Sequence, residues 1–439
     1  MLCMKKLWFV LRLCLVLPLH AQDVLTLTEA LSLGLEKNYA IRIAQLQRDS
    51  LDNQLTLGNA GFLPVITADG TRQFSVNDTR QVFLDGRNNA LDNARTDVLN
   101  GSIDATWRIF DGFNMFVAYE SLTQLRKVGE FTQRAAIENL VADITDAYYN
   151  VVQQTARVRA FENTLTISEQ RLQLAQDNYE VGTGTRAEYL AAQADLNTDR
   201  SALMQEQQLL KQAIIQVNAL LVRSPIVEFA VADTLIPLGD SLQFQELTDE
   251  LGSANTELRQ ARLRRDIALL RTRAVKSQRY PQVDVYGSYS YNRSNSQAGF
   301  LLQNRQVGYT YGVTARINIF DGFNQNRREQ NARVTERIRE AQVENTQIGL
   351  ESVLAQVYND YVNSLRLIQL EQENYAISQE RVSIELDRYR IGVSTPLQLR
   401  EAQTTTVETN RRLIEAQYTA KQAETELLRL TGRLVNTTN

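Results

Sequence analysis

The chain has 439 residues and a formal net charge of −4, and its composition limits what it can be. The length would allow two or three compact domains. With only six prolines, however, stretches of more than 100 residues run uninterrupted and are rich in Gln, Glu, Arg, Ala and Leu, which is typical of long helices. The acidic balance argues against nucleic acid as a partner.

The first residues differ from everything that follows. Two lysines and Arg12 supply positive charge around an apolar run over residues 7–19, and the small residue Ala21 suits a cleavage site. This pattern predicts a secretory signal peptide over residues 1–21. A retained membrane anchor is the alternative, but about 13 apolar residues are short for a span. Neither cysteine lies in a lipoprotein-type cleavage box, so we expect export without lipidation.

Removal of the signal peptide would change the chemistry available to the protein. Both cysteines (Cys3 and Cys14) and the only histidine (His20) lie within it. A mature chain without them cannot form disulfides, thiolate nucleophiles, Ser-His-Asp triads or His/Cys zinc sites. It would retain 44 basic and 51 acidic residues, a net charge of about −7. No Asp/Glu pair lies in a recognisable catalytic setting, so we expect no enzyme activity, no cofactor and no metal.

The mature chain is a tandem duplication. Residues 41–50 (IRIAQLQRDS) align with residues 258–267 (LRQARLRRDI) at an offset of 217. The string IFDGFN occurs at residues 109–114 and again at 319–324, an offset of 210. Tyr148/Tyr358, Tyr179/Tyr389, Gly182/Gly392 and Thr185/Thr395 also match at 210. The change of offset predicts a loop between residues 69 and 101 that is seven residues longer than its counterpart.

The repeat defines the expected domains. We expect a first repeat over residues 22–221, a linker over 222–240 that holds two prolines, a second repeat over 241–432 and a tail over 433–439. Each repeat has the same predicted order: a helix, a β hairpin, a very long helix, a sharp turn and a return helix. The predicted fold class is therefore mixed α and β, mainly α.

The two predicted hairpins, at about residues 64–110 and 281–320, alternate apolar and polar residues with a period of two. Val283, Val285, Tyr289 and Tyr291 fall on one face, for example, with Asp284, Ser288 and Ser290 on the other. Such strands suit an outer-membrane barrel, with lipid outside and water inside. A half-buried strand of a soluble sandwich has the same alternation. Because four strands cannot close a barrel by themselves, the barrel interpretation requires several chains.

The long helices are too polar to lie in lipid. From Phe113 to about Asp177 there is no proline, and about 65 helical residues would extend on the order of 100 Å. Apolar residues recur at helical spacing among charged residues, as expected for helices that pack on helices, and a simple coiled-coil rod would show the same stripe. The helices end at YEVGTGT (residues 179–185) and YRIGVST (389–395), where glycine can end one helix and Ser/Thr can cap the next.

These features together resemble the TolC family of outer-membrane efflux proteins, also called outer membrane factors. The resemblance rests on a duplicated helix, hairpin and long-helix unit with IFDG at the strand-to-helix corner and YxxGxxT at the helical tip, and it covers essentially the whole mature chain. It implies a TolC-like homotrimer with a 12-stranded outer-membrane β-barrel, four strands per chain, continued by a long periplasmic α-helical barrel.

The family resemblance also implies a function. We expect the outer-membrane exit duct of a tripartite efflux pump or a type I secretion system. A periplasmic adaptor and an inner-membrane pump of the RND, ABC or MFS type would be its partners, together with outer-membrane lipid. Drugs, small molecules or proteins would be the cargo. A structural coiled-coil rod or adhesin, anchored by a shared barrel, is the alternative.

The resemblance assigns two groups of residues at the tips. The adaptor-docking group, whose residues also suit tight-turn geometry alone, is Gly182, Gly184, Thr185, Gly392, Ser394 and Thr395. Family members carry acidic residues that line a constriction just past the tip, and here Glu188 and Glu401 retain two of these places while Ala191 and Gln398 do not. The alternative is that both glutamates are solvated surface charges. Arg186 and Arg400 are candidates for interhelical links that keep the tip closed.

The IFDGFN corners form the last candidate group. We expect a membrane strand to end there, the pairs Asp111-Gly112 and Asp321-Gly322 to turn the chain, and a helix to begin with Phe113 or Phe323. The aspartates are placed to cap that helix, and the aromatic residues suit the membrane boundary.

Overall fold

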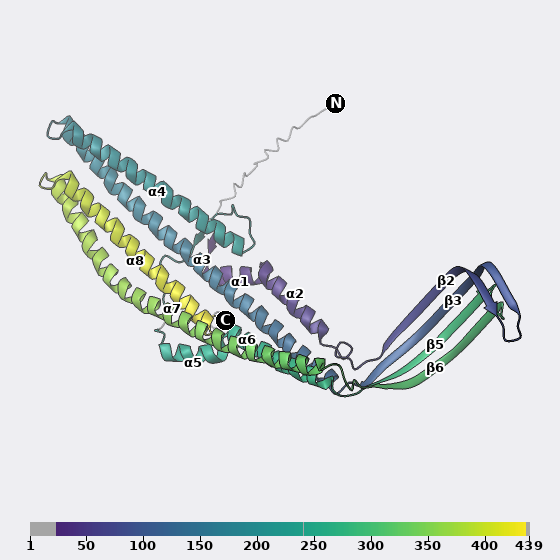
Figure 1. The fold of residues 1–439 in the computed structure, drawn as a ribbon. Coiled ribbons are helices and arrows are strands. Elements are labelled where there is room, and N and C mark those ends of the chain that lie inside the picture. Colours follow the sequence, from purple (N-terminus) through teal and green to yellow (C-terminus); the bar gives the residue numbers. More distant parts are fainter. Residues whose placement is uncertain (1–22, 240, 436–439) are drawn as a thin grey trace, which may run out of the picture.

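The computed structural model describes residues 23–239 and 241–435, and the predicted signal peptide lies outside these residues. The chain is elongated, with a four-stranded sheet at one end and two helical tips at the other (Figure 1). The first repeat contains β1 (Asp23–Leu25), α1 (Leu27–Lys37), α2 (Tyr39–Gln54), β2 (Val65–Val82), β3 (Asn88–Phe110), α3 (Asn114–Glu180) and α4 (Arg186–Leu220). After β4 (Phe229–Val231), the second contains α5 (Phe244–Ala254), α6 (Thr256–Ser277), β5 (Gln282–Ser296), β6 (Gln303–Arg316), α7 (Asn324–Arg390) and α8 (Pro396–Leu430).

The repeat extends to individual hydrogen bonds. Asn38 caps α2 and donates from its side chain to the carbonyl of Leu220 at 2.9 Å. Asn255 caps α6 in the same way and donates to the carbonyl of Leu430, also at 2.9 Å. Each asparagine breaks what the sequence predicted as a single helix into two, and ties the break to the end of the return helix. Both repeats otherwise follow the predicted order of helix, hairpin, long helix and return helix, and the short strands β1 and β4 were not predicted.

The sheet joins the two repeats in the order β2-β3-β5-β6, with every pair antiparallel. The central contact is between β3 and β5, where Arg108 pairs with Asp284 at 2.9 Å. The outer edges of β2 and β6 have no strand partner among the described residues.

Two hairpin predictions were wrong in detail. The extra residues of the first hairpin do not lengthen its loop, because they extend β2 and β3 to 18 and 23 residues, against 15 and 14 for β5 and β6. The ladder of β2 and β3 contains one register shift, between Asn77 and Thr79. The last strand was predicted to continue into the second IFDGFN string, but β6 ends at Arg316.

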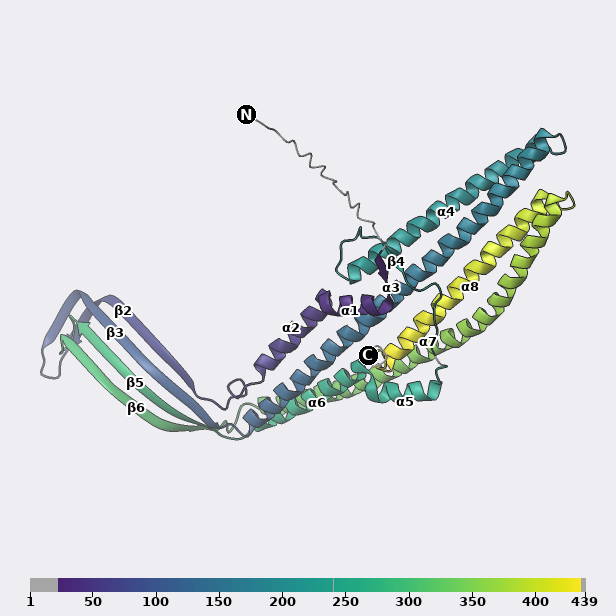
Figure 2. The same ribbon diagram turned by 180° about the vertical axis from the view of Figure 1, so that it is seen from behind.

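The long helices are as predicted. The helices α3 and α7 have 67 residues each, which corresponds to about 100 Å, and α4 and α8 have 35 each. Each return helix lies along the tip half of its long helix, and α2 or α6 lies along the half nearest the sheet (Figure 2). Among the described residues no helix is both long and apolar enough to cross a membrane.

The core lies at mid-length, where these helices meet. Ile144 and Tyr148 of α3 and Leu221 after α4 are fully buried there. The predicted linker over residues 222–240 contributes as well, since β4 pairs in parallel with β1 and Ile236 belongs to the same cluster. A second cluster around Leu354 and Leu427 serves the second repeat. This packing fixes the middle of the molecule and leaves the tips projecting from it.

Candidate functional site: the helical tips and the corners

The first tip is a tight turn built by glycine and a capping box. α3 ends at Glu180, and Gly182 follows with a φ of 80°, a left-handed conformation that favours glycine. The amides of Thr183 and Gly184 both donate to the carbonyl of Asn178 at 2.9 Å. Thr185 then caps α4, because its hydroxyl accepts from the Glu188 amide at 3.2 Å.

The second tip repeats this backbone with different side chains. Gly392 has a φ of 75°, and the amides of Val393 and Ser394 donate to the carbonyl of Arg388. Thr395 caps α8, and Pro396 occupies its first turn, where a missing N–H costs nothing. The Ser394 hydroxyl is buried and donates to Glu385, so this tip is tied more firmly to its own helix.

Large apolar side chains that were not predicted as site residues are exposed at both tips. Val181 is 73% exposed at the first tip, and Leu397 is 76% exposed at the second. Ile391 and Val393 are exposed beside Leu397. Their positions flanking the predicted tip glycines were a signal that could have identified them. Apolar residues held out by a rigid turn suit contact with another protein.

The two candidate gate glutamates are both exposed. Glu188 is the third residue of α4, and its carboxylate accepts from the Thr185 amide at 2.8 Å, completing the capping box. Glu401 lies one turn into α8, with Arg381 at 3.6 Å. In the single chain Glu188 therefore helps to start α4 and Glu401 pairs with Arg381, and the place of both glutamates at an aperture of several chains stays a prediction.

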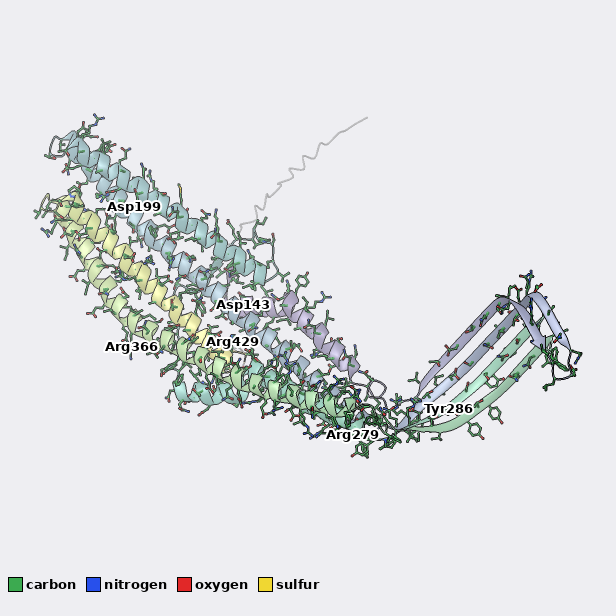
Figure 3. The ribbon with its side chains drawn as sticks, viewed as in Figure 1. Asp143, Asp199, Arg279, Tyr286, Arg366 and Arg429 are labelled. Atoms are coloured by element: carbon green, nitrogen blue, oxygen red, sulfur yellow. The ribbon has the colours of Figure 1, made fainter. Side chains whose placement is uncertain are left out.

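Arg400 and Arg186 differ in whether they form an ion pair. The Arg400 guanidinium bonds both oxygens of Asp199 at 2.8 and 2.9 Å, and so connects α8 to α4 of the other repeat. Asp199, labelled on α4 in Figure 3, is buried and also accepts a hydrogen bond from Ser168. Its pairing with Arg400 raises the pKa of Arg400. Arg186 forms no ion pair within the described part of the chain.

A second link lies beside the first. Arg171 of α3 is only 2% exposed, bonds Asp195 of α4 and lies 3.5 Å from the Gln403 side chain of α8. Asp195 and Asp199 are one turn apart on α4, which is the spacing that brings both to one helix face. Arg171, Asp195 and Asp199 could not be predicted as a link, because no local pattern in the sequence shows which helix faces which.

The first corner is sterically closed. Gly112 has a φ of 70°, and a Cβ atom there would lie 2.8 Å from the Cβ of Tyr280 and closer still to the carbonyl oxygen of Ser277. Asp111 is buried and accepts from the Met115 amide at 3.2 Å, which supports the predicted capping. Phe113 precedes α3 instead of beginning it, in a left-handed conformation with a φ of 66°.

The second corner has the same backbone and open surroundings. Gly322 has a φ of 66°, and a Cβ there would approach only the Asn324 side chain, at 3.8 Å. The Asp321 carboxylate pairs with Arg328 at 2.9 Å and does not cap α7, so that prediction was wrong for this copy. Phe323, like its counterpart, precedes the helix. Both corners stack their two flanking phenylalanines edge to face.

Residues 23–239 and 241–435 contain no group of three or more His, Cys, Asp or Glu that could hold a metal ion. The candidate site therefore consists of two helical tips, the ion pairs that link the helices near them, and the two strand-to-helix corners.

Comparison with known proteins assigns this scaffold to a family. The family model described as "Outer membrane efflux protein" matches residues 30–222 and 247–433. Protein CyaE of Bordetella pertussis is 22% identical over 348 residues, which make up 78% of this chain and 70% of that protein.

Solved structures share the fold at low identity. The outer-membrane channel OprN superposes with a TM-score of 0.76 and 18% identity, over 92% of this chain and 89% of its own. VceC of Vibrio cholerae superposes with a TM-score of 0.75 and 16% identity, over 92% and 96%.

The family resemblance, the TolC-like fold and the outer-membrane location extending into the periplasm are thereby confirmed. The family is one of channels and not of enzymes. Because the family model matches most of its length, this chain belongs to the outer membrane efflux protein family and is an outer-membrane export channel.

Proposed function

We propose that three copies of this chain form one continuous exit duct, to which a periplasmic adaptor and an inner-membrane pump dock at the helical tips. The described residues of each chain supply four strands in one sheet, whose two outer edges have no strand partner. An open edge in lipid leaves backbone groups without partners, so the sheets must close on one another. Three chains give twelve strands, an even number that suits a closed antiparallel barrel.

The observation that carries the docking proposal is the pair of tips. They lie at the far end of the molecule from the sheet, about one long-helix length away (Figure 1). Both hold exposed apolar residues on a turn fixed by a left-handed glycine. In an aqueous periplasm such residues suit a protein partner. The adaptor would seat there, and a pump of the RND, ABC or MFS type would feed the duct through it.

Replacing the tip glycines tests docking. Proline cannot adopt the positive φ of Gly182 or Gly392, so Gly182→Pro with Gly392→Pro would rebuild both turns. We expect trimers to remain in the membrane while export, measured as drug resistance or secretion, is lost. Gly349→Ala is the matched control, because Gly349 lies inside α7 with open space around it. Unchanged export by the double variant would contradict docking at the tips.

We further propose that the link between Arg400 and Asp199 holds the periplasmic end of the duct closed. It joins the return helices of the two repeats and is partly shielded from solvent. A hydrogen-bonded charge pair of this kind contributes about 1.5–3 kcal/mol, enough to shift a closed-to-open ratio about tenfold or more.

Conductance in a planar lipid bilayer tests this gate. Arg400→Ala should raise the mean conductance of the reconstituted trimer, since Asp199 would retain only Ser168 as a side-chain partner. Arg186→Ala is the matched control, because this exposed arginine forms no ion pair among residues 23–239 and 241–435. Equal conductance of the two variants would contradict the proposal that Arg400 helps to hold the duct closed.

The same recording separates the duct from the rod or adhesin. A rod anchored by a shared barrel needs no conducting path along the helices. A trimer that conducts no ions even after Arg400→Ala would favour the rod. In the proposed duct the chain catalyses no reaction and needs no cofactor. The cargo passes through the channel chemically unchanged.

A further inference from the structure

The apolar face of the sheet carries a sharply defined band. Paired residues on neighbouring strands point to the same side, and every second residue returns to it. Between Val283 and Tyr291 of β5, the residues on this side are uncharged on all four strands. On β5 they are Val285, Gly287 and Tyr289, and the positions paired with Tyr289 are Ile103 on β3 and Tyr309 on β6.

The next row ends the band with arginine. Arg72 pairs with Leu99, Leu99 with Arg293, and Arg293 with Arg305, so one continuous row crosses all four strands. Three of its four residues are arginines, and all three are exposed. We call Arg72, Arg293 and Arg305 the arginine row. Neither the proposed duct nor the tips use it.

The position of the row along the strands is that of a membrane boundary. Arg293 lies ten residues beyond Val283, about 33 Å along a strand, or about 25 Å along the normal for a strand tilted by about 40°. The apolar band of an outer-membrane barrel is about 25 Å tall. The helices lie at the other end of the strands (Figure 2), and in the proposed duct they extend into the periplasm. The arginine row therefore lies at the outer, cell-surface boundary.

The charge of the row is not balanced within the chain. Arg293 and Arg305 are directly paired across β5 and β6, and like charges opposite each other destabilise a sheet. Asp97 lies in the next row on this face; it bonds Arg72 at 3.1 Å, and its charge interacts with Arg293. Arg305 lies over the Tyr291 ring at 5.5 Å. Within residues 23–239 and 241–435, Arg293 and Arg305 form no ion pair.

We propose that the arginine row binds the phosphate groups of a phosphorylated glycolipid in the outer leaflet. Guanidinium groups bond phosphate oxygens in a two-pronged geometry, and a phosphate between Arg293 and Arg305 would relieve their repulsion. The neighbouring tyrosines and valine would contact the acyl chains of the same lipid. In the proposed trimer the row would recur in each chain and encircle the barrel.

Titration with lipid A tests this proposal. Purified, delipidated protein in an uncharged detergent is titrated with bisphosphorylated lipid A, with dephosphorylated lipid A and with inorganic phosphate, and the thermal unfolding midpoint is followed. We expect only bisphosphorylated lipid A to raise the midpoint. Arg293→Gln with Arg305→Gln should require about tenfold more of it, or lose the response. Arg316→Gln is the matched control on the opposite face of β6 and should respond like the natural chain.

Three outcomes would overturn the proposal: an equal response by the double variant, an equal response to dephosphorylated lipid A, or a full response to inorganic phosphate alone. The comparison of the three ligands needs no variant, so a misfolded double variant would not leave the question open. The readout involves neither conductance nor docking. Failure of the duct proposal would therefore not change its result.

Discussion

The two IFDGFN corners have identical sequences and nearly identical backbones, but their surroundings differ. At the first corner, Asp111 is buried and Gly112 is pressed against the end of α6. At the second, Asp321 reaches only Arg328, and the space beside Gly322 is open. The repeated letters therefore determine the local turn. The neighbouring residues, which come from distant parts of the chain, determine how much each corner residue contributes to stability.

The same contrast extends along the whole molecule. At the tips, Glu188 and Gln398 do the same capping work with different charge. At mid-length, Asp146 of α3 corresponds to Gln356 of α7 at the repeat offset of 210, so an acid in one repeat stands where the other has an amide. Duplicated positions thus act as internal controls, and each of the following predictions changes one copy against the other.

The corner glycines should give the largest difference. Gly112→Ala adds a methyl group where Ser277 and Tyr280 leave no room, in addition to left-handed strain, a combined cost of about 3 kcal/mol or more. Gly322→Ala adds only the strain, about 1–2 kcal/mol. The thermal midpoint of each purified variant in detergent, with the yield of folded trimer, measures both. Equal losses would mean that another copy of the chain fills the second corner.

Asp146 should give an intermediate effect, of the opposite sign. Burial, reinforced by Asp143 and Glu426, raises the pKa of Asp146 to about 7, and one of its carboxylate oxygens has no partner among the described residues. A raised pKa means that the ionised carboxylate destabilises the folded state. The destabilisation of the folded state by Asp146 therefore grows as the pH rises from the unfolded pKa near 4 towards 7.

Asp146→Asn should therefore stabilise the protein by about 2 kcal/mol at pH 7.5, and the gain should vanish near pH 4. Thermal or denaturant unfolding across this pH range measures the difference. Gln356→Asp is the control, because this exposed position can hold an acid at little cost. A gain for Asp146→Asn that is independent of pH would contradict a titration of Asp146.

The sequence predicted those features that depend on neighbouring residues alone. Gly182 and Gly392 adopt a positive φ, and Thr185 and Thr395 cap the next helix. The turn at each tip could therefore be predicted from a few neighbouring residues. The alternation in the hairpins and the absence of proline in α3 and α7 gave strands and long helices for the same reason.

Contacts between residues that are far apart in the chain could not be predicted from the sequence. Arg400 and Asp199 are 201 residues apart, and nothing in either local stretch shows that α8 and α4 face each other. Both arginines near the tip were candidates, and only the packed helices distinguish Arg400 from Arg186. The seven extra residues could have formed a loop or longer strands, and only the register of β2 on β3 decides between them.

The smallest expected effect concerns Glu188, whose place in the capping box is taken at the second tip by the uncharged Gln398. Its carboxylate accepts from the Thr185 amide at 2.8 Å, and the Gln398 amide oxygen accepts from the Thr395 amide at 2.9 Å. Because the neutral group does the same work, Glu188→Gln should change stability by less than about 0.5 kcal/mol. The reversal potential of the reconstituted channel in a salt gradient should also stay the same. A shift of that potential away from cations would show instead that three copies of Glu188 ring the aperture, since a ring of carboxylates favours cations.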